Sequence, residues 1–386
     1  MPQSTAREML AWFQQHQEEM VDFIRHLVNL ESPSDVPASQ QAVFDCLNQE
    51  LVKLNYRVIR LSGKQSGGHL FASPVKRFKN RPIQLLLGHC DTVWPLGTID
   101  NMPLEYKDGM LHGPGIYDMK TGLAQIIFVL KALQAIQQEP EVTPILFINS
   151  DEEVGSKESS RHIHRLARLV NRSFVLEPSL GPAGQIKTAR KGIGRFTVTI
   201  KGKAAHAGLD PGGGASAILE LSHVIQKLFE LNDVEKGITV NVGMIDGGLR
   251  PNVVAPNSTA VSDVRVLTQR DAEYIEQAIH SIKPTTPGVI LEIEGKIGRP
   301  PLEKTPANRK LWEMAVQLAQ QLDLKLEEGT AGGGSDGNTT SLYSATLDGL
   351  GAVGDGAHAI HEHIDPDKLP ERSALLALLL LSPTLT

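Results

Sequence analysis

The chain of 386 residues lacks the features that mark several common protein classes. It has only two cysteines, Cys46 and Cys90, too few for a disulfide framework, and we expect Cys90 to be a packed thiol. Acidic residues outnumber basic ones by 44 to 38, and no Lys/Arg cluster outweighs that balance, which argues against a nucleic-acid surface. The longest apolar run, residues 374–381, falls far short of the ~20 residues of a membrane span.

We expect no signal peptide at the N-terminus. No basic head followed by an apolar stretch is present, so the segment does not resemble a signal peptide. We therefore predict a cytoplasmic protein without a membrane or nucleic-acid partner. A hydrophobic fraction of 41% and a charged fraction of 21% are those of an ordinary globular protein, and the length suits about two domains.

The residue pattern divides the chain into two parts. The first part alternates apolar strands with amphipathic helices, which predicts an α/β domain. From about residue 191 the strands alternate apolar and polar residues, as one-sided antiparallel strands do, and this predicts an inserted α+β domain. Residues 298–301 look like the return to the first domain. At the N-terminus, Thr5 and Glu8 form a capping-box pattern that predicts one amphipathic helix reaching Leu30.

The strand predicted at residues 83–87 is the centre of the first domain. Its branched apolar residues are typical of a strand buried on both faces. His89 and Asp91 follow it, and side chains two apart in an extended segment point the same way. We therefore expect Asp91 to accept the second ring N–H of His89, as happens beside metal-bound histidines. Ligands of open α/β sheets bind beyond the carboxyl ends of the strands, where this pair would lie.

The same pattern returns twice further along the chain. The apolar strand predicted at residues 144–148 is followed by three adjacent carboxylates, Asp151–Glu153. A third strand, predicted at residues 173–176, is followed by Glu177. Adjacent carboxylates repel one another unless a cation neutralises them or solvent screens them. An acid or histidine at the end of each of three strands indicates a metal site.

Two loops offer further ligands. Asp118 precedes a helix predicted at residues 123–136, where it is either the N-cap or a ligand held by its loop. Gly113 and Gly115 do not complete a dinucleotide-binding fingerprint, because Asp118 stands at the third glycine position and would repel a phosphate. Near the C-terminus three histidines lie within six residues, and we expect one ligand among them: His358, His361 and His363.

Together these residues form a set that can hold two metal ions. The set comprises His89, Asp91, Asp118, Glu152, Glu153, Glu177 and His358. A pair of ions ~3.5–4 Å apart with a shared carboxylate needs about this many ligands. Glu152 is then left over beside the ions, where a hydrolase needs a general base. Imidazole and carboxylate ligands suit Zn²⁺, and Co²⁺ or Mn²⁺ also fit.

These motifs resemble those of the dinuclear zinc amidohydrolases and peptidases that include aminoacylase, acetylornithine deacetylase, succinyl-diaminopimelate desuccinylase and glutamate carboxypeptidase. The matching segments follow the family's order over nearly the whole chain: Gly88–Val93, Gly113–Lys120, Ser150–Ser156, Leu176–Pro178, Lys201–Gly208 and Gly356–Ile364. The resemblance, closest to glutamate carboxypeptidase, implies an α/β fold with a mixed-sheet zinc-peptidase catalytic domain. That domain would span residues 1–190 and 300–386, with an inserted α+β, ferredoxin-like lid or dimerisation domain at 191–299.

The resemblance also implies the metal ligands, two Zn²⁺ per subunit. By analogy His89 and Glu177 hold one zinc, and Glu153 and His358 hold the other. Asp118 bridges the two ions.

Further residues take roles in catalysis and binding by the same analogy. Asp91 orients its neighbouring histidine, Glu152 is the general base, and His206 of the inserted domain holds the oxyanion together with zinc. For Arg265 the alternative is an ion pair with Asp263 on the same strand. The four residues expected to bind substrate are Asn252, Arg265, Arg299 and Gly334.

The expected protein is a zinc-dependent, homodimeric hydrolase acting on a small peptide or an N-acyl amino acid. It would cleave an amide next to a C-terminal amino acid, as glutamate carboxypeptidase does, or remove an N-acyl group, as aminoacylase and acetylornithine deacetylase do. A Glu at the position of Glu177 accompanies both activities in the family. A non-catalytic metal-binding homologue is the alternative, yet Glu152 and His206 are both present. A phosphate site at Gly332–Ser335 is disfavoured because no Walker lysine follows.

Overall fold

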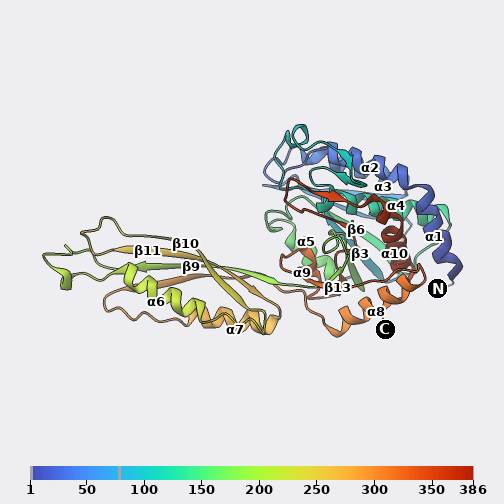
Figure 1. The fold of residues 1–386 in the computed structure, drawn as a ribbon. Helices are drawn as coiled ribbons and strands as arrows, with labels where there is room; N and C mark the ends of the chain where they lie inside the picture. Colours follow the sequence, from blue (N-terminus) through green and yellow to red (C-terminus); the bar gives the residue numbers. More distant parts are fainter. Residues whose placement is uncertain (1–2, 77–79, 386) are drawn as a thin grey trace. The chain divides into compact units, whose positions relative to one another are not determined.

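The structure, a computed structural model, describes residues 3–76 and 80–385, and the chain forms two compact units (Figure 1). Unit 1 comprises Met1–Thr188, Lys304–Ala331 and Ser335–Thr386. Unit 2 comprises Ala189–Glu303 and Gly332–Gly334. The boundaries expected from the sequence, 190/191 and 299/300, differ from these by a few residues. The expected division placed Gly332–Gly334 in the catalytic part, whereas in the structure these glycines belong to unit 2.

A mixed six-stranded sheet forms the centre of unit 1. Its strands in spatial order are β1 (Tyr56–Leu61), β2 (His69–Pro74), β6 (Thr143–Asn149), β3 (Ile83–His89), β7 (Arg172–Val175) and β14 (Ala345–Leu347). Neighbours from β1 to β6 pair antiparallel, whereas β6, β3, β7 and β14 run parallel. Because β3, β6 and β7 are parallel, their carboxyl ends meet at one edge of the sheet.

Alternate residues of the central strands enter two cores on opposite faces of this sheet. Leu86 and Leu146 face the larger core, and Leu85 and Phe147 face a smaller one that contains residues of α5 (Ser160–Ala167). Figure 1 shows α4 and α10 on one side of β3 and β6, with α5 on the other. Helices lining the larger core are α1 (Gln3–Gln15), α2 (Gln17–Asn29), α3 (Gln40–Lys53), α4 (Thr121–Ala135), α8 (Pro306–Gln320) and α10 (Leu369–Leu381). None of the helices between residues 3 and 385 that the structure describes has the length and apolar character needed to cross a bilayer.

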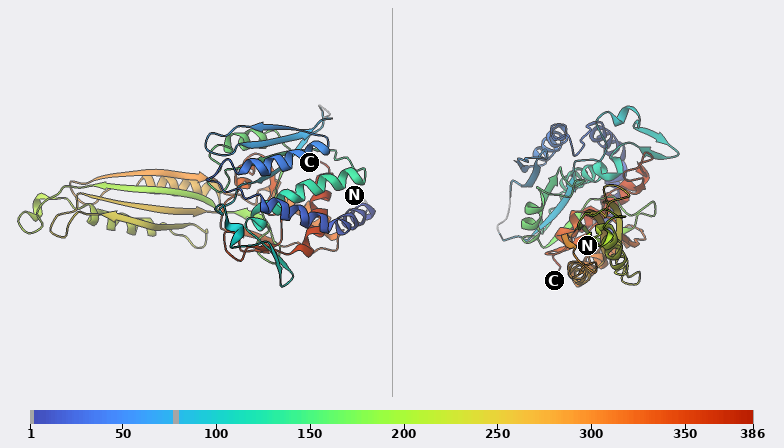
Figure 2. Two further views of the ribbon diagram at one scale, coloured as in Figure 1. Left: turned by 90° about the horizontal axis from the view of Figure 1, so that it is seen from above. Right: turned by 90° about the vertical axis from the view of Figure 1, so that its left-hand side faces the viewer.

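The prediction of a single N-terminal helix from the capping-box pattern was wrong, because the segment forms two helices. Helix α1 already includes Thr5, so this residue is no N-cap, and the chain breaks at His16 before α2 begins. The His16 ring stacks on Trp12, with 3.9 Å between ring centroids, and its Nδ1 lies 2.8 Å from the Trp12 carbonyl oxygen. The break lets α1 pack against α10 and α2 pack against α4, as the blue and red helices of Figure 2 show for the first pair.

Two smaller sheets join distant segments of unit 1, and the sequence did not predict them. One contains β15 (Gly354–Asp355), β16 (His363–Ile364), β5 (Met110–His112) and β4 (Glu105–Lys107) in that order. The other pairs β8 (Ile186–Arg190) with β13 (Glu328–Ala331). Pairing of β16 with β5 brings the C-terminal histidine segment beside the loop that follows β5. The short helix α9 (Asp336–Thr340) follows β13.

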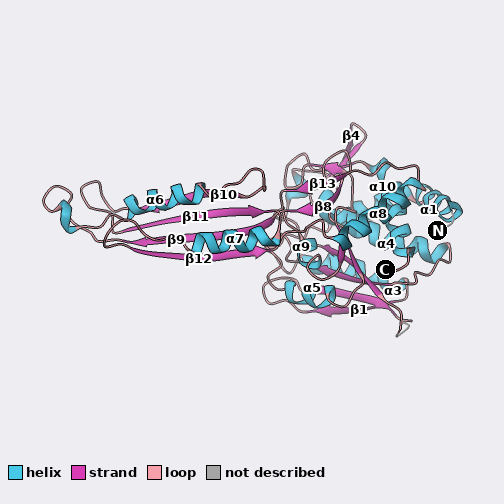
Figure 3. Cartoon of the chain, turned by 90° about the horizontal axis from the view of Figure 1, so that it is seen from below, coloured by secondary structure: helices cyan, strands magenta, loops and turns pink. Residues whose placement is uncertain are grey.

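Unit 2 has the ferredoxin-like fold expected from the sequence. Its elements in chain order are β9 (Gly192–Lys201), α6 (Ala217–Phe229), β10 (Thr239–Gly247), β11 (Asn257–Val266), α7 (Gln269–His280) and β12 (Ile290–Arg299). The four strands are antiparallel in the order β10-β11-β9-β12, the βαββαβ arrangement. Both helices cover one face of the sheet (Figure 3), where apolar residues of β9 and β11 are buried against them. Strand β10 was not predicted.

The C-terminal end of α10 depends on one buried arginine. Nearly every residue of α10 is buried, so its last carbonyl groups need partners within the protein. Arg172 Nη2 donates to the carbonyls of Leu379 (3.1 Å) and Ser382 (2.7 Å), and Nη1 donates to that of Pro383 (2.7 Å). Its Nε donates to Gln84 Oε1 on β3 at 2.9 Å. Arg172 therefore caps α10 and ties it to the central sheet.

We predict that Arg172→Met lowers the free energy of unfolding by about 2–4 kcal/mol, because several buried acceptors lose their donor at once. Urea denaturation followed by circular dichroism measures the change. The control is Arg57→Met at an exposed position of β1, which should change stability by no more than about 0.5 kcal/mol. Equal effects of the two substitutions would contradict the capping role.

Candidate metal centre

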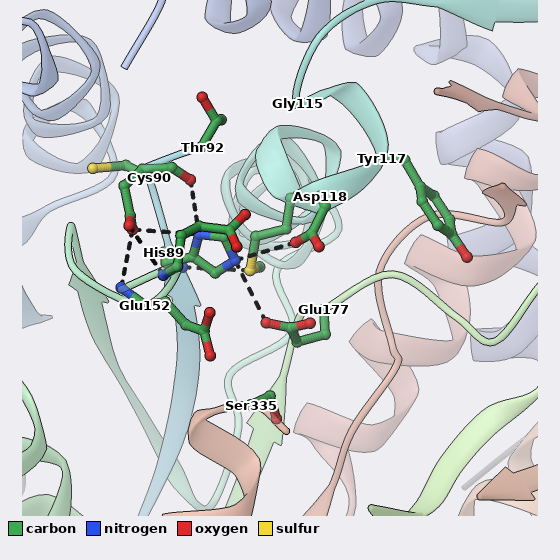
Figure 4. Close-up of polar contacts among 12 residues, drawn as sticks. His89, Cys90, Thr92, Gly115, Tyr117, Asp118, Glu152, Glu177 and Ser335 are labelled. Atoms are coloured by element: carbon green, nitrogen blue, oxygen red, sulfur yellow. Dashed lines mark hydrogen bonds and ion pairs between the residues drawn. The ribbon is translucent and has the colours of Figure 1, made fainter. Parts of the chain in front are cut away.

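The seven residues expected at the metal site lie together at the carboxyl edge of the unit 1 sheet. Figure 4 shows His89, Asp118, Glu152 and Glu177 among them. His89 ends β3, the two adjacent glutamates follow β6, and Glu177 follows β7. Asp118 comes from the loop before α4, and His358 from the loop between β15 and β16. The parallel order of the strands thus brings together side chains that are far apart in the sequence.

His89 is buried and presents one ring nitrogen to the carboxylates. Its Nδ1 lies 2.9 Å from the main-chain oxygen of Asp91, an acceptor that requires the proton on this nitrogen. Its Nε2 lies 3.2 Å from Asp118 Oδ1 and 3.5 Å from Glu177 Oε1. In the neutral ring Nε2 therefore offers a lone pair toward two carboxylates, the arrangement of a metal-binding histidine.

The sequence predicted the wrong acceptor for His89: the ring N–H donates to the main-chain oxygen of Asp91 and not to its carboxylate. The carboxylate Oδ1 lies 3.5 Å from Nδ1, beyond good hydrogen-bond distance, and the main-chain oxygen takes its place. The carboxylate instead accepts the main-chain N–H groups of Glu152 (3.2 Å) and Glu153 (3.1 Å) and the hydroxyl of Ser34 (2.7 Å). Asp91 thus holds the turn that carries both glutamates.

A second histidine meets the carboxylates from the other side. His358 Nε2 lies 3.1 Å from Glu153 Oε2 and 3.6 Å from Asp118 Oδ2. Asp118 therefore turns one oxygen to each histidine, as a bridging carboxylate does. His363 packs instead on His112, with 5.0 Å between ring centroids, whereas His358 contacts the site through Glu153.

Asp118 is not the N-cap of α4. The N-cap position belongs to Lys120, and Asp118 lies in the preceding turn with its side chain toward the histidines. A glycine brings this turn close to the neighbouring ligand. A Cβ on Gly122 would lie only 2.1 Å from the carbonyl oxygen of Leu176, which precedes Glu177, so the close approach of helix and strand requires glycine.

Potential ligand atoms form two groups whose members lie within 4.8 Å of one another. One group contains His89, Glu152 and Glu177, and the other contains His89, Asp118 and Glu153. Glu152 is thus a member of the first group, close enough either to coordinate a metal ion or to act as a base next to one.

The electrostatics of the site require positive charge. Burial opposes ionisation of Asp118, yet hydrogen bonds from His358 and His89 hold the pKa of its carboxyl well below its usual range. Hydrogen bonds to Asp118 and Glu153 raise the pKa of His358 to about 10, against the effect of burial. Burial raises the pKa of Glu153 to about 6 despite its contact with His358. The carboxylates therefore bind protons or cations, and two imidazoles among carboxylates fit a pair of divalent ions.

The residues expected outside the ligand set belong to unit 2. His206 is exposed, and its Nδ1 accepts the main-chain N–H groups of Gly208 and Leu209, both at 3.1 Å. The neutral ring therefore carries its proton on Nε2. In this tautomer Nε2 is a hydrogen-bond donor and can donate to an oxyanion. Asn252 lies next to this loop, where its main-chain carbonyl accepts the N–H of Ala207 at 3.0 Å.

Arg265 forms the ion pair that the sequence left as its alternative. Its Nε and Nη2 donate to the two carboxylate oxygens of Asp263 at 2.7 and 3.0 Å. Its Nη1 lies 3.4 Å from the carbonyl oxygen of Gly332. The last two predicted residues are neighbours, since a Cβ on Gly334 would lie 2.6 Å from Arg299 Cδ.

Sequence reasoning missed two residues that support the site. Ser34, which was given no role at the site, donates to the Asp91 carboxylate at 2.7 Å. Glu362, placed between His361 and His363 in a segment read for its histidines, is fully buried and bonds to the loop that carries Asp118. No local signal in the sequence marks this residue, because its hydrogen-bond partners lie 244–268 positions earlier in the chain.

Fold and site together define a metal-dependent hydrolase with a second, ferredoxin-like unit. The chain belongs to peptidase family M20/M25/M40, whose family profile matches residues 85–382. Carboxypeptidase G2 of Pseudomonas sp. (strain RS-16) is 28% identical over 373 residues, 95% of this chain and 89% of the relative. Succinyl-diaminopimelate desuccinylase of Delftia acidovorans is 28% identical over 303 residues, 74% of this chain and 77% of the relative.

Solved structures share the whole fold. Aminopeptidase PepT from Bacillus cereus has a TM-score of 0.80 at 22% identity and covers 95% of this chain and 98% of that one. A dinuclear metal-binding peptidase of the M20 family from Bacillus subtilis has a TM-score of 0.69 at 16% identity and covers 95% and 98%. The expected family, fold class and metal-dependent hydrolase are therefore confirmed.

The adjacent glutamates allow a matched pair of substitutions. We predict that Glu152→Gln keeps two bound metal ions and loses at least ~100-fold in turnover, the scale of a general base. Glu153→Gln, which alters a proposed ligand, should lose a metal ion. Elemental analysis after gel filtration counts the metals, and release of free amine measures turnover. Loss of a metal from Glu152→Gln would reassign Glu152 as a ligand.

Proposed function

We propose that the protein is a dinuclear zinc hydrolase that cleaves the amide bond next to a C-terminal amino acid. The observation that carries this proposal is the Asp118 carboxylate, which turns one oxygen to His89 and the other to His358 with Glu152 nearby. The similarity to carboxypeptidase G2 over 95% of the chain supports the choice of bond.

The roles of the chain's residues follow from their contacts. A bound metal pair supplies Lewis acidity that polarises the amide carbonyl and makes water more acidic. Glu152 takes the proton of the attacking water and returns it to the leaving amine. His206, with its proton on Nε2, donates a hydrogen bond to the oxyanion. Asp91 keeps Glu152 in place through the main-chain N–H that it accepts.

Arg265 is the proposed partner of the substrate's terminal carboxylate. Its pair with Asp263 uses Nε and Nη2, so the guanidinium is held rigid, while Nη1 makes a long contact of 3.4 Å with the carbonyl oxygen of Gly332. A planar, preoriented guanidinium suits recognition of a carboxylate. We propose Asn252, Arg299 and Gly334 as further parts of the substrate site.

Removal of an N-acyl group is the second candidate function. The similarity to succinyl-diaminopimelate desuccinylase over 74% of the chain favours it. Chemically it is the same amide bond, with the recognised portion on the acyl side. The two candidates differ in which half of the substrate the protein must recognise.

Unit 2 also supports a proposed homodimer. Strand β10 lies at the edge of its sheet, and three large apolar side chains on or near it are 68–70% exposed: Met244, Ile245 and Leu249. Exposed apolar residues along an open strand edge favour pairing with a second chain. The cytoplasmic location stays a prediction.

We predict that Arg265→Met lowers kcat/KM for substrates with a free C-terminal carboxylate. The loss corresponds to transition-state stabilisation on the order of 2–4 kcal/mol. The loss should be much smaller for the matching C-terminal amides. The assay uses zinc-loaded protein with N-acyl amino acids, dipeptides and their amides, and detects the freed amine.

Lys201→Met is the control for Arg265, because it removes an exposed cation at the far end of β9 that pairs with Glu292. It should leave both substrate classes unaffected. An equal loss on acids and amides would make Arg265 structural and would shift the choice toward the deacylase.

We predict that His206 serves the active site of the partner subunit in the proposed dimer. Heterodimers of His206→Ala and Glu152→Gln subunits then contain one site with both functional residues. They should recover up to half of the wild-type turnover per dimer, while each homodimer stays inactive. Differently tagged subunits allow the heterodimer to be purified and assayed, and no recovery would exclude sharing between subunits.

A further inference from the structure

Glu362 is a fully buried carboxylate that accepts hydrogen bonds only from uncharged donors among the contacts described. Its Oε1 accepts the main-chain N–H groups of Tyr117 at 2.9 Å and Asp118 at 3.0 Å. Its Oε2 accepts the N–H of Gly115 at 2.8 Å and the indole N–H of Trp94 at 2.7 Å. Three of the four donors belong to the turn that carries Asp118.

The main chain around Glu362 strengthens the same connection. Its carbonyl accepts the N–H of Gly113 at 3.2 Å, and the pairing of β16 with β5 continues the contact. Its own N–H donates to the carbonyl of Ala359 at 2.9 Å, which closes the turn directly after His358, and the N–H of Ala359 donates to the carbonyl of Gly356 at 2.8 Å across His358 itself. His358 has a positive φ of 62°, so this turn needs outside contacts to hold its shape.

We propose that Glu362 is a positioning residue of the metal centre, which fixes the segment of Asp118 against the segment of His358 and thereby sets metal affinity without binding the metal. This inference rests on the ligand roles proposed for Asp118 and His358. By the proposed roles both side chains would hold the same cation, and His358 Nε2 lies 3.6 Å from Asp118 Oδ2, so a shift of either segment changes the distance between their ligand atoms. Partners behind the ligands hold such distances in metal sites.

Only a carboxylate of this length satisfies all four donors. Each oxygen accepts two N–H groups, and an ionised carboxylate has acceptors on both oxygens. In glutamine one of the oxygens becomes an NH₂ donor. Whichever way the amide turns, two N–H groups then face a donor. Aspartate keeps both acceptors, but it is one methylene shorter and cannot reach both edges of the turn.

A matched control exists in unit 2. Glu220 is also fully buried, and its carboxylate accepts the main-chain N–H groups of Thr285 at 3.0 Å and Thr286 at 2.6 Å. Glu220→Gln therefore removes the same kind of interaction from a loop that holds no proposed ligand. Both substitutions should lower the melting temperature, so stability alone does not separate a positioning role from a structural one.

Metal affinity separates the two roles. Zinc binding to folded wild-type, Glu362→Gln and Glu220→Gln proteins is measured by competition with a chromophoric chelator. We expect the weaker zinc site of Glu362→Gln to lose 10–100-fold in affinity, the usual effect of a partner behind a metal ligand. Glu220→Gln should stay within threefold of the wild type. Wild-type affinity at both sites of Glu362→Gln, or an equal loss in Glu220→Gln, overturns the proposal.

The wild-type titration tests the ligand roles separately. Fewer than two zinc ions bound by the wild-type protein would refute the dinuclear centre itself, whereas two ions with an unaffected Glu362→Gln refute only the role of Glu362. Should Glu362→Gln fail to fold, Glu362→Asp takes its place with the same titration. Wild-type affinity in Glu362→Asp likewise overturns the proposal.

Discussion

Mutual repulsion among carboxylates at one edge of the unit 1 sheet is the constraint on which the rest of the structure depends. Asp118, Glu152, Glu153 and Glu177 converge there because β3, β6 and β7 are parallel and end at the same edge. Burial raises the pKa of Glu153 to about 6, and hydrogen bonds to Asp118 and Glu153 raise the pKa of His358 to about 10, so positive charge near these carboxylates is favourable. A divalent cation meets that demand more fully than protons do, so metal binding and the order of these loops are thermodynamically linked.

Two further carboxylates, those of Asp91 and Glu362, hold the segments that carry the proposed ligands. Asp91 and Glu362 each accept main-chain N–H groups. Burial raises the pKa of Glu362 to about 7, and the hydrogen bonds from Asp118 and Gly115 oppose that effect. They turn two irregular segments, one carrying Glu152 and Glu153 and the other carrying Asp118, into rigid supports. Carboxylates with few N–H donors around them are thus the proposed metal ligands, whereas carboxylates that accept several main-chain N–H groups hold loops in place.

The local part of this arrangement was predictable from the sequence, and the long-range part was not. An apolar strand followed by His89 or Glu177 is a signal within ten residues, and parallel pairing then brings such ends together. By contrast, Glu362 bonds to Gly115 across 247 positions, through strands of two and three residues whose pairing has no sequence signature. The break at His16 depends in the same way on packing of α1 and α2 against α10 and α4. Which atom of Asp91 contacts His89 depends on the turn after β6, because the N–H of Glu152 in that turn donates to the Asp91 carboxylate.

The division of residues between the units bears on specificity. Every proposed metal ligand belongs to unit 1, whereas His206, Asn252, Arg265, Arg299 and Gly334 all belong to unit 2. A carboxypeptidase and a desuccinylase match this chain at the same identity, 28%, so the shared ligand motifs do not by themselves choose the substrate. Metal chemistry acts on the amide bond that both reactions have in common. The choice between them must therefore come from residues that contact the groups on either side of that bond, and unit 2 is where we place that choice.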